Sequence, residues 1–169
     1  MSKFYREIYK LKELLRRGWI LRGLGDNRVE SDLEHVCSMC MLAMEIISKR
    51  QLKIDELKVY KLILCHELGE IDVGDITPVD GVSKEEKAAK EFACVERIAS
   101  ECELSEINEY VKEYAERKTE EAKFVKNLDK LDCVMQAKIY SEKYNRPDIY
   151  EEFYNNAYET IKEYIEFLE

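Results

Sequence analysis

A histidine and several carboxylates lie close together in one short segment of the chain. The segment LILCHELGEIDVGDI, residues 62–76, contains an apolar run that ends at His66 and is followed by Glu67, Glu70 and Asp75. The whole chain of 169 residues contains only two histidines. A histidine beside carboxylates can bind a divalent metal ion or transfer protons. This segment is therefore the first candidate for chemistry.

The other histidine and a distant aspartate could complete a metal site with this segment. His35 lies one turn into a helix expected to open at Ser31, and Asp129 lies inside a later long helix. Helices of a packed bundle can direct the two histidines, Glu67 and Asp129 into one space. Such a nitrogen and oxygen donor set suits Mn, Co, Mg, Fe, Ni or Zn. From the residues alone, two interpretations remain open. The four residues could form a metal site, or each could be an ordinary hydrogen-bonded or surface residue.

Three segments resemble motifs of the HD-domain phosphohydrolase superfamily, and of its 5′-deoxynucleotidase-like branch in particular. RRGWILRG followed by ESDLEH resembles the arginine–tryptophan segment and the first ligand histidine. LCHELGEIDVGDITP resembles the HD-x-x-E-x-x-x-GD segment, and VKNLDKLDCVMQAKIY the K-x-x-DK helix. The resemblance covers roughly residues 10–145.

The resemblance implies roles for the residues that match these motifs. The implied metal ligands are His35, His66 and Asp129, with Glu67 at the position of a fourth. Glu70 would face the same site and activate or position water, or protonate the leaving oxygen. The resemblance also implies a homodimer.

The same motifs imply a substrate site. An arginine, either Arg16 or Arg17, would contact the phosphate together with Trp19, because an arginine fork suits phosphate oxygens. Asp75 would reach the 3′-hydroxyl of deoxyribose. Trp19 could equally belong to the core.

Glu67 departs from the family pattern, which usually has aspartate after the second histidine. The extra methylene moves the carboxylate oxygens by roughly a bond length, whereas metal–oxygen distances tolerate changes of about 0.2 Å. The helix could shift slightly, Glu67 could bind in another way, the metal preference could change, or the site could be impaired or metal-free.

The composition favours a small anionic ligand over a nucleic-acid polymer. The net charge is −9, yet residues 1–28 carry eight basic and three acidic residues, a balance of +5 that leaves −14 for the rest. Cationic residues at one end and carboxylates at the other fit a phosphorylated small molecule that is bound with a metal, whereas nucleic acid needs clustered lysine and arginine.

The cysteines and the hydropathy pattern indicate the cellular compartment that we expect for the protein. The six cysteines lie mostly in apolar helical patterns, and the CxxC of Cys37 and Cys40 has no second pair to complete a zinc site. Neither a secretory signal nor a membrane span is recognisable. We expect a cytoplasmic protein with reduced thiols and no membrane partner.

The chain reads as one all-α domain, residues 1–169. It has 46% apolar and 37% charged residues but only six glycines and two prolines, which favours helices. Capping boxes begin at Ser31 and Ser83, and apolar spacing predicts helices near 3–17, 31–47, 55–70, 83–101, 105–117, 120–144 and 149–168, with the segment 72–81 as an interruption. The expected architecture is a compact HD-type bundle of six or seven helices.

These observations favour a metal-dependent phosphohydrolase that removes the 5′-phosphate from (deoxy)nucleoside monophosphates. A first alternative keeps the fold and changes the substrate to another nucleotide phosphate ester, such as a nucleoside triphosphate, a cyclic dinucleotide or an alarmone. A second alternative is a non-catalytic nucleotide-binding protein in which Glu67 has disabled the metal site.

Overall fold

The computed structural model describes residues 1–77 and 80–168, and it is all-helical, as the sequence predicts. Pro78 and Val79, within the interruption expected at 72–81, lie outside the described residues. The helices are α1 Lys3–Glu13, α2 Arg17–Trp19, α3 Asp32–Arg50, α4 Glu56–Cys65, α5 Glu70–Val73, α6 Lys84–Cys102, α7 Glu106–Glu116, α8 Glu120–Tyr144 and α9 Pro147–Ile161, with a π-helical turn at Ile20–Leu24 and a 3₁₀ turn at Lys162–Phe167. Within the described residues, seven of these helices have ten or more residues.

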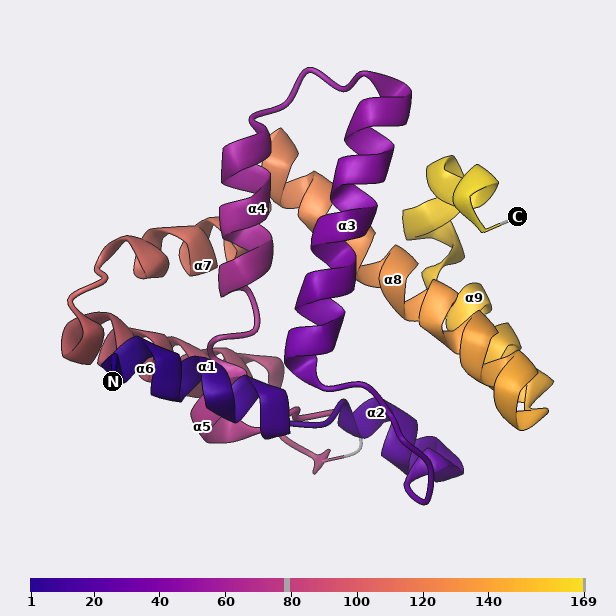
Figure 1. Cartoon of the computed structure of the whole chain (residues 1–169), viewed down its shortest axis with the longest axis horizontal. Coiled ribbons are helices and arrows are strands. Elements are labelled where there is room, and N and C mark those ends of the chain that lie inside the picture. The colour runs from indigo at the N-terminus through magenta and orange to yellow at the C-terminus, as the bar shows by residue number, and fades with distance from the viewer. Residues whose placement is uncertain (78–79, 169) are drawn as a thin grey trace.

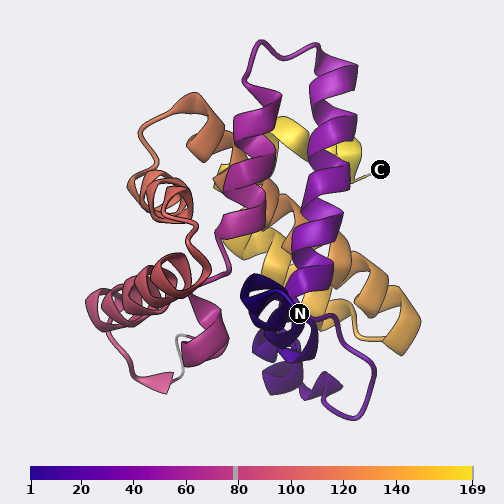
Figure 2. The same cartoon turned by 60° about the vertical axis from the view of Figure 1, so that its left-hand side comes forward.

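The long helix α8 forms the centre of the bundle. Figure 1 shows α3 and α4 side by side with α8 crossing behind them, and Figure 2 shows α9 running beside α8. Apolar side chains at three- and four-residue spacing on α8, such as Leu128 and Leu131, pack against Met39 and Ile46 of α3 and against Leu62 of α4. Burial of each such side chain contributes about 1.5–3 kcal/mol. This core fixes α3, α4 and α8 relative to one another.

The first predicted helix ends earlier than expected, at Glu13 rather than near residue 17. Residues after it run extended, and Leu15 forms an isolated antiparallel bridge with Ser31. The backbone N–H of Arg16 donates to the carbonyl of Glu30 at 3.0 Å, and the N–H of Asp32 donates to Leu14 at 2.9 Å. These contacts place Arg16 beside the start of α3. The Ser31 capping box is present and fixes that start.

The helix predicted over 55–70 is divided in two. The helix α4 ends at Cys65, and Glu70 begins the short α5 after an intervening turn. The predicted C-terminal helix also ends early, at Ile161, and tightens into the 3₁₀ turn. None of the helices in the part of the chain that the structure describes is both long and apolar enough to cross a membrane.

Gly69 allows the turn before α5 to approach α6 closely. A Cβ added there would lie 2.6 Å from the Cβ of Glu91 and 3.0 Å from its Cα. Because the second atom belongs to the backbone of α6, a side-chain rotation cannot relieve the clash. We expect Gly69→Ala to lower the free energy of unfolding by about 1–3 kcal/mol, because α5 and α6 must separate. Urea unfolding measures this.

Gly18→Ala is the matched control, because its added Cβ meets only a side-chain nitrogen of Arg22 at 3.7 Å. We expect its stability to lie within about 0.5 kcal/mol of the parent. Equal effects at the two glycines would contradict the packing argument.

Candidate metal centre and active site

The two histidines hold their Nε2 atoms toward the same buried space. The Nδ1 of His35 lies 2.7 Å from Oδ2 of Asp132, and the Nδ1 of His66 lies 2.7 Å from the carbonyl oxygen of Ile63. A carbonyl only accepts, so the Nδ1 of His66 carries the proton. Both Nε2 atoms are buried and have no hydrogen-bond partner among the described residues. Each histidine thus presents a nitrogen suited to a metal ligand.

Two carboxylates face these nitrogen atoms. An oxygen of Glu67 lies 3.4 Å from Nε2 of His66 and 3.8 Å from Nε2 of His35. An oxygen of Asp129 lies 3.5 Å from Nε2 of His35. The structure therefore brings together the four ligands expected from the sequence, on α3, on α8 and in the turn after α4. This mixed nitrogen and oxygen set fits a divalent cation.

The two histidines, together with Arg16 and Lys126, favour the ionised form of both carboxylates. Burial would raise the pKa of Glu67, but His66 and Arg16 hold it well below its usual range. Burial is likewise outweighed at Asp129, where His35 and Lys126 lower the pKa. The Nζ of Lys126 lies 2.6 Å from Asp129. Ionised carboxylates are the form that binds metal.

Two aspartates affect the protonation of His35. Burial and Arg16 oppose protonation, yet Asp129 and Asp132 together raise the pKa of His35 above its ordinary value. A divalent cation bound at Nε2 would displace that proton.

Asp132 contacts the Nδ1 atom of the candidate ligand His35, on the side of the ring away from Nε2. It was not among the site residues expected from the sequence. Its carboxylate bonds Nδ1 of His35 and also accepts from the hydroxyl of Ser38 at 2.6 Å. Such an outer partner fixes the orientation of a ligand histidine. We expect Asp132→Asn to weaken metal binding about 10- to 100-fold, measured by calorimetric titration with Mn²⁺.

Ser38→Ala serves as the control for this variant, because the hydroxyl of Ser38 contacts Asp132 and the backbone carbonyl of His35 but not the imidazole that would bind metal. We expect its metal affinity to change less than that of Asp132→Asn. Unchanged affinity in Asp132→Asn would show that Asp132 does not orient the histidine.

Glu70 lies at the start of α5, beside the ligands. Its Oε1 lies 3.0 Å from Nζ of Lys87, and its Oε2 is buried without a hydrogen-bond partner in the described chain. Burial, followed by the charges of Glu67 and Asp75, raises the pKa of Glu70, whereas Lys87 lowers it. A carboxyl with a raised pKa can carry a proton at neutral pH and deliver it. No sequence signal distinguished Lys87 from a surface lysine.

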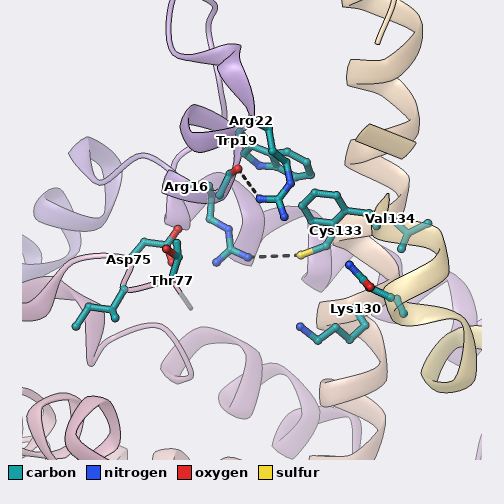
Figure 3. A pocket seen from close by; sticks show the side chains of 13 residues that line it. Arg16, Trp19, Arg22, Asp75, Thr77, Lys130, Cys133 and Val134 are labelled. Carbon is teal, nitrogen blue, oxygen red and sulfur yellow. Dashed lines mark hydrogen bonds between the residues drawn. The ribbon is translucent and has the colours of Figure 1, made fainter. Parts of the chain in front are cut away.

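Two cavities meet at this centre. One of about 300 Å³ is lined by His66, Glu67 and Glu70. The other, about 360 Å³, contains Trp19 and Phe153 in its wall. Three side chains line both cavities: Arg16, Asp75 and Lys130. Figure 3 shows these three around the second cavity, with Arg16 between Asp75 and Cys133. Each cavity is at the small end of the range for ligand sites.

The two neighbouring arginines take different positions. Arg16 donates to Glu67 at 2.7 Å, and its other terminal nitrogen lies 3.5 Å from the sulfur of Cys133. Arg17 pairs through its guanidinium with Asp80 and lines neither cavity. The extended segment before α2 thus directs Arg16, and not Arg17, toward the metal ligands.

Trp19 and Asp75 also lie beside the second cavity. Trp19 is 2% exposed, donates from its indole nitrogen to Glu30 at 2.9 Å and stacks on Phe153 with ring centroids 4.5 Å apart. It is therefore both a core residue and part of the cavity wall. Asp75 accepts from the backbone N–H of Arg17 at 2.7 Å.

The chain matches a family model and curated relatives along most of its length. The model described as HD domain matches residues 8–168. The 5′-deoxynucleotidase HDDC2 of Xenopus laevis is 36% identical over 160 residues, which are 93% of this chain and 77% of the relative. The human protein of that name is 33% identical, with 93% and 76% covered. The 5′-deoxynucleotidase hdd1 of Schizosaccharomyces pombe is 34% identical, with 80% and 70% covered.

Solved structures share the fold. A conserved hypothetical protein from Pyrococcus furiosus superposes with a TM-score of 0.77 and 27% identity, with 97% of this chain and 91% of that chain covered. A predicted metal-dependent phosphohydrolase from Magnetospirillum magnetotacticum gives a TM-score of 0.71 at 22% identity, with 98% and 87% covered. The latter identity supports the fold alone.

Proposed function

The chain belongs to the HD-domain family, and from that premise we propose that it is a metal-dependent phosphohydrolase that removes the 5′-phosphate from deoxynucleoside monophosphates. The observation that carries the proposal is that the buried Nε2 atoms of both histidines, which have no hydrogen-bond partner among the described residues, face the carboxylates of Glu67 and Asp129. The relatives named 5′-deoxynucleotidase support the reaction and the substrate class.

The metal ligands in this proposal are His35, His66, Glu67 and Asp129. A divalent ion held there supplies positive charge beside the phosphate and acidifies a water molecule for attack. The donor set admits Mn, Co, Mg, Fe, Ni or Zn.

The surrounding side chains bind the phosphate and manage the proton. Arg16 lines both cavities, so its guanidinium can contact a phosphate placed between them and offset the charge that develops on its oxygens. Lys130, which lies in the same two walls, adds a second cation. Glu70 carries the proton that the leaving 5′-oxygen requires, and Lys87 holds its carboxyl in place.

The second cavity is the proposed place for the nucleoside. Asp75 lies between the two cavities, where its carboxylate can accept a hydrogen bond from the 3′-hydroxyl of the sugar. The apolar wall formed by Trp19 and Phe153 suits the base. Arg17, the other arginine expected at the phosphate, is less well placed because it faces Asp80.

Phosphate release from a panel of 5′-nucleotides tests the proposed function. Deoxy- and ribonucleoside mono- and triphosphates are incubated with Mn²⁺, Co²⁺, Mg²⁺ or no added metal. We expect metal-dependent release of phosphate from the deoxynucleoside monophosphates, because the relatives that the chain matches are named 5′-deoxynucleotidase. Release of pyrophosphate or triphosphate instead would favour the alternative substrates, and no release would contradict the proposal.

The homodimer stays a prediction from the resemblance, and the cytoplasmic location stays a prediction from the cysteines and the hydropathy pattern. Sedimentation equilibrium of the purified chain would establish whether it is a dimer. The second alternative from the sequence, a non-catalytic nucleotide-binding protein, depends on Glu67 and is tested by the Glu67 variants described in the Discussion.

A further inference from the structure

Asp32, at the first position of α3, is a buried carboxylate that the proposed reaction does not yet use. Its side chain is 0% exposed, and neither carboxylate oxygen has a hydrogen-bond partner among the described residues. The exposed N–H groups of this helix end are capped by Ser31 instead. Burial and the charge of Glu67 raise the pKa of Asp32 to about 7, because a buried carboxylate is strongly unfavourable unless a cation faces it. The question is therefore which cation faces Asp32.

Arg16 is the cation that faces Asp32. Its Nη1 lies 3.9 Å from Oδ1 of Asp32 and 2.7 Å from Oε1 of Glu67. The first distance is too long for a hydrogen bond, whereas the second is a strong one. The backbone contacts of Arg16 with Glu30 and of Asp32 with Leu14 hold the two residues side by side. Arg16 thus lies between two carboxylates and bonds only one of them.

Two cations require the Glu67 carboxylate in the proposed enzyme. Arg16 bonds it in this structure, and the divalent ion needs it as a ligand. Arg16 is itself largely buried, with 15% of its side chain exposed, so its charge must keep a partner when Glu67 binds metal. Asp32 offers a carboxylate that belongs to no ligand set and lies next to the guanidinium.

We propose that Asp32 is the positioning residue for Arg16: it accepts the guanidinium when Glu67 binds metal and keeps Arg16 directed at the substrate phosphate. This inference rests on the proposed function, because the phosphate is the group that Arg16 would bind. Asp32 acts through Arg16 and touches neither metal nor substrate. Its removal should therefore weaken anion binding and leave metal binding in place.

A double-mutant cycle on inorganic phosphate binding tests the inference. Four Mn²⁺-loaded proteins are titrated with phosphate by calorimetry: the parent, Asp32→Asn, Arg16→Ala and the double variant. We expect Asp32→Asn to weaken phosphate binding about tenfold in the parent, as for loss of a hydrogen bond between charged groups, and to have no further effect when Arg16 is alanine. The KM for a deoxynucleoside monophosphate should rise by a similar factor, with kcat changed less than about twofold.

Other results would overturn the inference. Equal losses in both backgrounds would mean that Asp32 acts without Arg16, and loss of Mn²⁺ from Asp32→Asn would make it part of the metal site. Unchanged phosphate binding in Asp32→Asn, or no phosphate binding in the parent, would remove the proposed role. Asp32→Ser repeats the cycle if the asparagine variant does not fold.

The binding cycle does not depend on turnover. A parent that binds phosphate through the coupled pair but hydrolyses no nucleotide would contradict the proposed function and retain the positioning role of Asp32. A parent that hydrolyses nucleotides while the cycle shows no coupling would contradict the positioning role of Asp32 and retain the proposed function.

Discussion

Glu70→Gln is expected to lower kcat by about 10²- to 10⁴-fold while leaving one equivalent of metal bound, because general acid–base catalysis contributes about that much. The amide keeps the size of the side chain and can still accept from Lys87, whose Nζ lies 3.0 Å from Glu70. It can neither release nor take up the proton. Steady-state kinetics with a deoxynucleoside monophosphate and metal analysis of the purified variant measure the two quantities.

Glu91→Gln is the matched control for this variant. Glu91 also pairs with Lys87, at 3.3 Å, and its removal perturbs the same lysine without removing the proposed proton donor. We expect its kcat to lie within about threefold of the parent. Unchanged turnover in Glu70→Gln would exclude Glu70 from the mechanism, and equal losses in the two variants would assign the effect to Lys87.

The sequence identified the residues that are unusual along the chain. Residue types and spacing alone left a metal site and ordinary structural roles as alternatives, and the resemblance to the HD-domain motifs indicated His35, His66, Glu67 and Asp129 as ligands. The helices that carry them follow from apolar spacing and from the Ser31 cap, which the structure contains. Spacing within one helix therefore predicts the helices, whereas the candidate ligands, which lie in α3, after α4 and in α8, followed from the order of the motifs along the chain.

Residues whose role depends on contacts between helices could not be found in this way. Asp132 resembles any charged residue of a long helix, and only the packing of α8 against α3 places it 2.7 Å from His35. Lys87 and Asp32 are similar cases. The choice between Arg16 and Arg17 depended on where α1 ends, because the extended residues after Glu13 decide which arginine faces inward.

The position of Glu70 shows that an error in a predicted helix need not move a residue away from its expected neighbours. The sequence suggested one continuous helix in which Glu70 follows His66 by a turn, but α4 ends at Cys65 and α5 starts at Glu70. Glu70 still lies beside the ligands, because Gly69 lets the turn pack against Glu91 of α6. Tertiary packing therefore supplies the position that helical periodicity suggested.

Glu67 stands where the family pattern has aspartate, and its contact with Arg16 gives a reason for the longer side chain. Its carboxylate reaches both histidine nitrogens, at 3.4 and 3.8 Å, and bonds Arg16 at 2.7 Å with the same oxygen. A side chain one methylene longer than aspartate can extend to the guanidinium and still face the ligands. These distances support a metal-binding Glu67 over an impaired site.

Glu67→Ala is expected to remove the bound metal and to lower kcat/KM by at least about a thousandfold, because one of four ligands is lost and the phosphate site loses its charge. The variant should be destabilised by less than the roughly 3–5 kcal/mol expected for a buried charge left without a partner, since Asp32 can then accept the guanidinium of Arg16. Metal analysis, steady-state kinetics and urea unfolding measure the three effects.

Two further variants separate the roles of Glu67. Glu67→Asp retains the charge but withdraws the oxygens by roughly a bond length, so we expect weaker metal binding with most of the stability kept. Combining Glu67→Ala with Arg16→Met also leaves the buried Asp32 without its facing cation, and we expect this double variant to be less stable than Glu67→Ala and to bind no metal. Full metal content and turnover in Glu67→Ala would instead limit the ligand set to His35, His66 and Asp129, and Glu67 would then serve only as the partner of Arg16.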